Sequence, residues 1–126
     1  MKLSDLRNFL CGALEARELS RLIQGEVVAF REASLKKGSV MSVILVEDSI
    51  GLRFGDAELK VLCGAFLEGQ IDRWVLSYIC DALLMSNSVV FLEDSIRDSV
   101  DVMTDPEVNG EVTEEMIRRI VATLGD

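Results

Sequence analysis

Four aspartates near the end of the chain recur at helical spacing, at Asp94, Asp98, Asp101 and Asp105. Carboxylates set close together can bind a metal ion, serve as an acid and base pair, or attract a cationic partner. Their intervals of four, three and four residues match a helix of about 3.6 residues per turn, which places all four on one narrow stripe. The sequence therefore predicts a helix with a uniformly negative front.

The opposite side of this predicted helix is apolar, because Ile96, Val100 and Met103 fall on it. Like charges at such spacing repel each other by roughly 0.2–0.5 kcal/mol per pair on an isolated helix. No basic residue lies within the stripe to offset that repulsion. The pattern therefore favours a surface shaped for a positive partner over one shaped for stability.

The negative charge of the chain is concentrated at its end. Residues 93–126 carry a net charge of −7, out of −9 for all 126 residues. Nucleic acids and anionic membranes are disfavoured as partners because both require basic patches. A basic protein is the natural counterpart, and Glu107 and Glu111 extend the predicted partner-binding surface beyond Asp105. A charged surface that only confers solubility is the alternative.

A second candidate for partner binding is the pair Trp74 and Tyr78, four residues apart beside Arg73. Tryptophan, tyrosine and arginine are typical anchors of protein interfaces. They are equally typical of the edge of a core, where the ring is buried and the polar tip reaches the rim. The sequence leaves both interpretations open.

Catalysis and metal binding find little support in the residue types. The chain has no histidine, which excludes Ser-His-Asp and Cys-His sites, and the acidic stripe is expected to be solvated. Residues 105–110 resemble the start of a calcium loop, but Met116 occupies the position of the bidentate glutamate. We therefore expect no enzymatic activity and no cofactor or metal. The three cysteines are expected to be buried, reduced thiols: Cys11, Cys63 and Cys80.

Length and composition fit one globular domain spanning residues 1–126. Apolar residues make up 49% of the chain and only one residue is proline, so a substantial core can form. No apolar run approaches the ~20 residues of a membrane span. The first residues carry charges too early for a signal peptide. A cytoplasmic location is the expectation, and nothing in the sequence sets an oligomeric state.

The two halves of the chain share a pattern. Residues 9–20 and 66–77 both read Phe-Leu-x-Gly-x-(Leu/Ile)-(Glu/Asp) at their start, with Gly12 and Gly69 suited to the left-handed position after a helix. Each copy therefore predicts a helical hairpin. A second match, between residues 42–50 and 88–96, predicts a short extended segment in each half. An internal duplication follows, with units of about 3–50 and 57–104.

Periodicity and capping residues define the expected elements. Helices are predicted at 3–11 capped by Ser4, at 15–36 weakened at Gly25, at 57–68 capped by Asp56, at 72–85 capped by Asp72, at 95–104, and at 113–124 capped by Thr113. Extended segments are predicted at 40–46 and 89–92, with a loop or short strand at 52–55. The fold class is mainly α: duplicated helical hairpins forming a compact bundle, with room for one small β element.

Residues 66–79 carry a resemblance to a known class of proteins. Their Phe-Leu-x-Gly-x-Ile-Asp spacing resembles the helical-hairpin signature of small bacterial immunity proteins, such as those paired with colicin D and with contact-dependent growth-inhibition toxins. The loop at 105–110 also looks similar to that family. The resemblance covers the two hairpins and this loop.

The resemblance implies a small acidic cytoplasmic inhibitor that neutralises a basic toxin domain, often a nuclease. Such inhibitors occupy the positively charged cleft of the toxin or a surface beside it. The acidic stripe would then stand in for nucleic-acid phosphates. The alternative, from a different functional class, is a helical adaptor or regulatory subunit that binds a basic protein. A toxin gene immediately upstream of this one would favour the immunity function.

Overall fold

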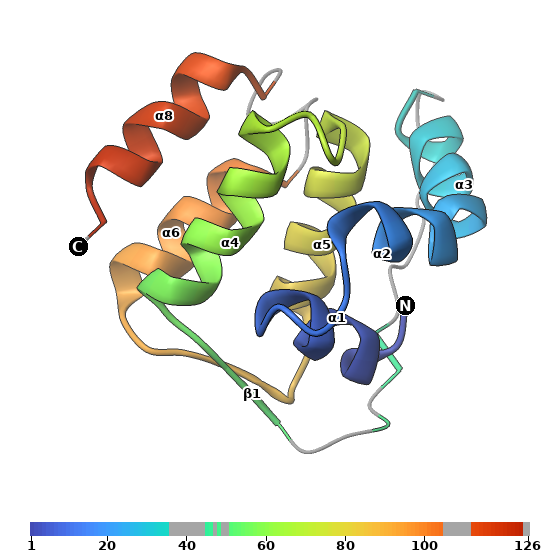
Figure 1. Cartoon of the computed structure of the whole chain (residues 1–126), viewed down its shortest axis with the longest axis horizontal. Helices are drawn as coiled ribbons and strands as arrows, with labels where there is room; N and C mark the ends of the chain where they lie inside the picture. The colour runs from blue at the N-terminus through green and yellow to red at the C-terminus, as the bar shows by residue number, and fades with distance from the viewer. Residues whose placement is uncertain (36–44, 47, 49–50, 105–111, 125–126) are drawn as a thin grey trace.

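The computed structural model of the chain describes residues 1–35, 45–46, 48, 51–104 and 112–124. These residues form a mainly helical structure with one small parallel sheet (Figure 1). The predicted fold class, a compact mainly α bundle with one β element, is thereby confirmed. The elements in chain order are α1 Leu3–Leu10, α2 Ala16–Leu22, α3 Gln24–Leu35, β1 Leu52–Phe54, α4 Asp56–Leu67, α5 Arg73–Met85, β2 Val89–Phe91, α6 Asp94–Val102 and α8 Glu114–Ala122.

Both predicted hairpin turns end their first helix with a left-handed glycine. Gly12 has φ +88° and Gly69 has φ +75°, a conformation that costs glycine little because it has no Cβ. Each turn closes with the same two backbone hydrogen bonds of a Schellman motif. They join Gly12 N to Phe9 O and Ala13 N to Asn8 O, and Gly69 N to Phe66 O and Gln70 N to Ala65 O. The turns thus match in geometry as well as sequence, while the proposed duplication of whole units stays a hypothesis.

Capping at α5 and α8 follows the prediction. One carboxylate oxygen of Asp72 accepts hydrogen bonds from the backbone N–H groups of Trp74 and Val75, both at 2.9 Å. The hydroxyl oxygen of Thr113 accepts one from the N–H of Met116 at 3.2 Å. These bonds satisfy donors that a helix start leaves without partners.

Two other predicted caps are wrong. Ser4 lies inside α1, and its N–H and hydroxyl donate to the carboxylate of Asp48 at 3.0 and 2.7 Å, so a residue distant in sequence satisfies the first turn. These bonds hold the pKa of Asp48 below its usual value. Asp56 is the first residue of α4 rather than its cap, and the Glu58 carboxylate accepts from the N–H of Gly55 at 2.9 Å.

The helix predicted over 15–36 is divided into α2 and α3. The break is at Ile23, which has φ −105° and ψ 8° and a side chain only 1% exposed. Gly25 lowers helix propensity there by about 1 kcal/mol relative to alanine. The chain can therefore bend so that both Ile23 and the buried face of α3 reach the core.

The two strands pair in parallel with Leu52 opposite Val89 and Phe54 opposite Phe91. The rings of Phe54 and Phe91 meet edge to face, with centroids 5.8 Å apart. This pairing confirms the extended segment predicted at 89–92 and decides for a strand at 52–54. The extended segment predicted at 40–46 lies mostly outside the described residues. Within its described part, Val46 forms a parallel bridge with Lys2.

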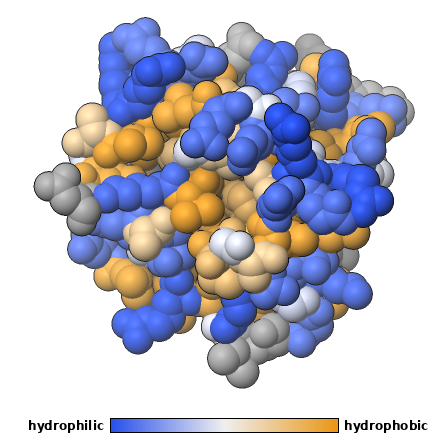
Figure 2. Space-filling view, viewed as in Figure 1, coloured by the Kyte–Doolittle hydropathy of each residue, from blue (hydrophilic) through white to orange (hydrophobic). Residues whose placement is uncertain are grey.

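The core forms around α5, in which nine residues from Trp74 to Leu83 are buried. Figure 1 shows α4 and α5 at the centre, with α6 and α8 on one side and α1 to α3 on the other. Buried residues from Met1 to Ile117 form one hydrophobic cluster that draws on both halves of the chain. Figure 2 shows apolar surface still visible between α8 and α4, where the last helix covers the core only partly.

The cysteines divide into two kinds. Cys63 and Cys80 are fully buried as predicted, and burial raises the pKa of the Cys63 thiol to about 12. Burial also raises the pKa of the Cys80 thiol. Cys11 is exposed, contrary to prediction, because it lies at the end of α1 where the chain turns toward Gly12.

Candidate functional site: an acidic helix face

Helix α6 is held to the molecule by its apolar side. Ile96, Val100 and Met103 are 2%, 0% and 0% exposed, and the helix packs on α5. The backbone turns into this helix at Glu93, directly after β2. The sheet and α5 together therefore fix which side of α6 faces outward.

The outward side carries the predicted carboxylates. Asp94, Asp98 and Asp101 are all exposed, and with the exposed Glu93 they form what we call the acidic face. Asp94 and Asp98 form no ion pair with any described residue. The acidic face thus offers carboxylates to solvent at about one per helical turn, roughly 6 Å apart along the axis.

Three of the predicted partner-binding residues cannot be placed. Asp105, Glu107 and Glu111 lie outside the described residues, as does the segment resembling a calcium loop. The acidic face as described therefore ends at Asp101.

The only basic residue of α6 is directed to an aromatic ring. The guanidinium carbon of Arg97 lies 6.0 Å from the ring centroid of Phe91 in β2, within the range of a cation–π contact. Sequence reasoning missed this contact because it depends on how β2 and α6 meet. It anchors the start of α6 to the sheet.

The acidic residues of α8 are arranged differently. Glu114 pairs with Arg118 at 3.6 Å, and Glu115 pairs with Arg119. Both pairs join residues four apart on the same helix, so the acids of α8 are offset locally. Among the described residues from Glu93 onward, excess negative charge is therefore concentrated on α6.

Trp74 and Tyr78 lie at a core edge. They are 8% and 2% exposed, and the ring of Phe30 packs edge-on against both, with centroids 6.5 and 5.5 Å away. The Tyr78 hydroxyl donates a hydrogen bond to the carboxylate of Glu26 at 2.6 Å, and burial together with this acid raises the pKa of Tyr78. The pair contacts α3, which lies across α5 from α6 (Figure 1). The structure thus does not bring Trp74 and Tyr78 together with the acidic face.

Sequence reasoning also missed a groove beside Trp74. It has a volume of about 460 Å³ and runs between α2, α3 and the start of α5. The signal was present in the spacing of Arg17, Arg21, Gln24, Val28 and Arg31, which recur every three or four residues as on one helix side.

Among the described residues, no three Cys, Asp or Glu side chains are grouped closely enough to hold a metal ion. No described helix is long and apolar enough to cross a membrane.

Comparison with known proteins yields no relative. No family model matches the chain, and no curated protein or solved structure matches it either.

Proposed function

We propose that the protein is an immunity-type inhibitor, which binds a basic protein toxin domain through the acidic face of α6. The observation that supports this most is the exposure of Asp94, Asp98 and Asp101 on a helix whose opposite side is fully buried. A rigid row of carboxylates complements a row of arginines or lysines without first having to be ordered.

The proposed mechanism is occupation of a cationic cleft. A nuclease binds its substrate largely through phosphates, so its cleft is lined with basic residues. Carboxylates of the acidic face take the place of those phosphates and exclude the substrate. The packing of Ile96, Val100 and Met103 resists the local unfolding that would release α6. The inhibitor itself performs no chemistry in this proposal.

The experiment begins with capture of the partner from the native strain, using the full chain as bait. We expect a basic toxin, encoded beside this gene, to be retained, and expression of this chain to protect cells from it. A matched pair of variants makes the result specific. Asp98→Asn with Asp101→Asn removes two charges from the acidic face, while Glu114→Gln with Glu115→Gln removes two from α8.

Only the first variant should lose capture and protection. Retention of a non-toxic complex by the parent chain would instead identify an adaptor subunit. Equal loss in both variants would show that total charge, rather than the acidic face, governs binding.

A further inference from the structure

The two-stranded sheet has an open edge on β2. The N–H of Leu52 donates to the carbonyl of Ser88 at 2.8 Å, and the N–H of Leu92 donates to the carbonyl of Phe54 at 3.0 Å. In a parallel ladder with this register, every second residue of β2 bonds to β1. The alternate residues direct their N–H and C=O groups away from β1: Val89 and Phe91.

These outward backbone groups have no partner in the part of the chain that the structure describes. No hydrogen bond reaches Val89 or Phe91 from the side opposite β1, and both residues are half-buried rather than enclosed. Figure 1 shows the sheet at the margin of the molecule, below the helices. An edge of this kind is a ready template for another strand.

The side chains of this edge do not protect it. Edge strands usually avoid pairing by carrying charges or proline, whereas residues 89–92 read Val-Val-Phe-Leu. Val90 is 59% exposed and Leu92 is 47% exposed, and residues two apart on a strand share one face. The edge therefore presents unpaired backbone and an apolar strip together, which are the two features that strand addition uses.

The charges beside this edge have one sign. Glu93 and Asp94 follow β2 directly and are exposed, while β2 and the three residues before it carry no charge. Arg53 is on β1, so a strand added to β2 would lie about 10 Å from β1, two strand spacings away. Arg97 lies against the ring of Phe91, on the face of the sheet opposite the apolar strip. The edge therefore favours a segment with a basic residue at the Glu93 end.

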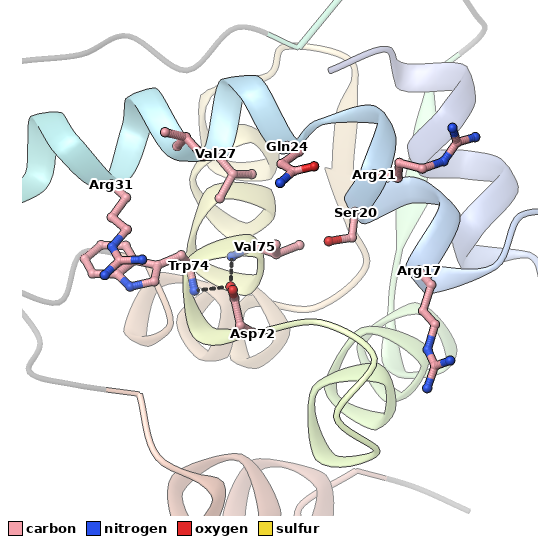
Figure 3. Close-up of a pocket in the computed structure, with 10 residues that line it drawn as sticks. Arg17, Ser20, Arg21, Gln24, Val27, Arg31, Asp72, Trp74 and Val75 are labelled. Carbon is pink, nitrogen blue, oxygen red and sulfur yellow. Dashed lines mark hydrogen bonds between the residues drawn. The ribbon is translucent and has the colours of Figure 1, made fainter.

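The groove beside Trp74 offers no such match. Figure 3 shows Asp72 between Arg17 and Arg31. A ligand of either sign meets repulsion there, so the charges of the groove do not specify a partner. The edge of β2 does specify one, because Glu93 and Asp94 both attract a cation.

We propose that the outer edge of β2 pairs with an extended segment of the basic partner, which adds a third strand to the sheet and places a basic residue against Glu93 and Asp94. The proposal rests on the proposed function, since it assigns this segment to the partner that the acidic face of α6 binds. The two surfaces are continuous, because Glu93 ends the strand and begins the acidic face. A second copy of β2 fits less well, since it brings no basic residue to Glu93 and each copy carries a net charge of −9.

The test measures amide hydrogen exchange in the full chain with two peptides as probes. One is Lys-Lys-Thr-Val-Thr-Val-Thr, which brings its lysines to Glu93 in antiparallel pairing, and the other has the reverse order for parallel pairing. At saturation, one of them should slow exchange of the Val89 and Phe91 N–H groups at least about fivefold. The N–H of Arg53, which points outward from the other edge of the sheet, is the control and should stay unchanged. The same peptides with Glu in place of Lys should give no protection.

Matched variants locate the binding by side chain. Val90→Lys places a positive charge on the edge and should weaken binding of the lysine peptide by about fivefold or more. Val28→Lys makes the same change on α3, where the side chain is 48% exposed, and should alter binding by less than about twofold. Circular dichroism checks that both variants fold, and the exchange measurement on the parent chain needs neither variant.

Several results would overturn the inference. These are unchanged exchange of Val89 and Phe91 with both lysine peptides, equal protection by the glutamate peptides, and equal weakening by the two variants. Sedimentation of the chain alone adds another, because self-association that Val90→Lys abolishes would assign the edge to a second copy.

The proposed function can fail separately. Capture of the partner that depends on Asp98 and Asp101, with Val89 and Phe91 unprotected by either peptide, would leave the proposed function standing without the added strand. Capture that survives Asp98→Asn with Asp101→Asn but is lost in Val90→Lys would support the added strand and contradict binding through the acidic face.

Discussion

Asp72 positions the start of the central helix with a single carboxylate oxygen that accepts two backbone hydrogen bonds. Replacing it with alanine should lower the free energy of unfolding by about 0.5–2 kcal/mol, the usual cost of losing a side-chain cap. Asp72→Asn keeps an acceptor oxygen and should lose less. Urea denaturation measures both. Equal stability of the parent and Asp72→Ala would mean that packing alone positions α5.

The buried thiols and Tyr78 make stability depend on alkaline pH. The folded protein raises the pKa of Cys63 to about 12, and it also raises the pKa values of Cys80 and Tyr78. Because the unfolded chain then loses protons first, the contribution of these three groups to stability is constant below the unfolded cysteine pKa of about 8.5 and falls above it. Urea midpoints between pH 7 and 10 in reducing buffer should show this fall. Cys63→Ala should make it shallower, and a midpoint that rises with pH would contradict the assignment.

At the scale of residues, the sequence predicts what depends on near neighbours. Asp72, Thr113, Gly12 and Gly69 act within a few positions of themselves, so their roles follow from local patterns. Ser4 does not, because its partner Asp48 lies 44 residues away. Only the fold brings that carboxylate to α1.

The exposed surface of helix α6 lowers the stability of the helix. The carboxylates of its acidic face repel one another, while burial of its apolar side offsets that repulsion. Replacing Asp98 and Asp101 by asparagine should leave the unfolding free energy unchanged or raise it by up to about 0.5 kcal/mol. Urea denaturation provides the measurement. A clear loss of stability would show that these carboxylates stabilise the fold. The variant would then change folding as well as binding.

At the scale of elements, periodicity predicts helices better than it predicts their breaks and pairings. The buried side of α6 matches the apolar spacing of the sequence, whereas α5 is buried all the way round from Trp74 to Cys80. The break at Ile23 and the pairing of β1 with β2 do not follow from it. Both result from packing between segments distant in the chain.

The whole molecule shares one core between its halves, as the single hydrophobic cluster shows. A fragment of residues 1–55 would lose the α4 and α5 surfaces against which its helices pack. Short helices are marginal alone in water, so this fragment should show weak helical circular dichroism and no cooperative melting. Cooperative melting of the fragment would mean that the halves fold as separate units.

The acidic face of α6 and the groove beside Trp74 differ in how far they could be predicted from the sequence. The acidic face follows directly from the spacing of Asp94, Asp98 and Asp101, because one helix generates it alone. The groove requires α2 and α3 to pack beside the start of α5 around Trp74, and no single segment contains that information. For Trp74 and Tyr78 the sequence left two interpretations open, and the structure shows the core-edge arrangement.

The most direct test of the central claim is the affinity of the captured basic partner for two charge-matched variants. Asp98→Asn with Asp101→Asn should weaken binding at least tenfold, and its association rate should depend less on salt, since steering carboxylates are lost. Glu114→Gln with Glu115→Gln should change affinity by less than about twofold, because those acids are offset within α8. Parent-like affinity of the first variant would contradict the claim that the acidic face of α6 binds the partner.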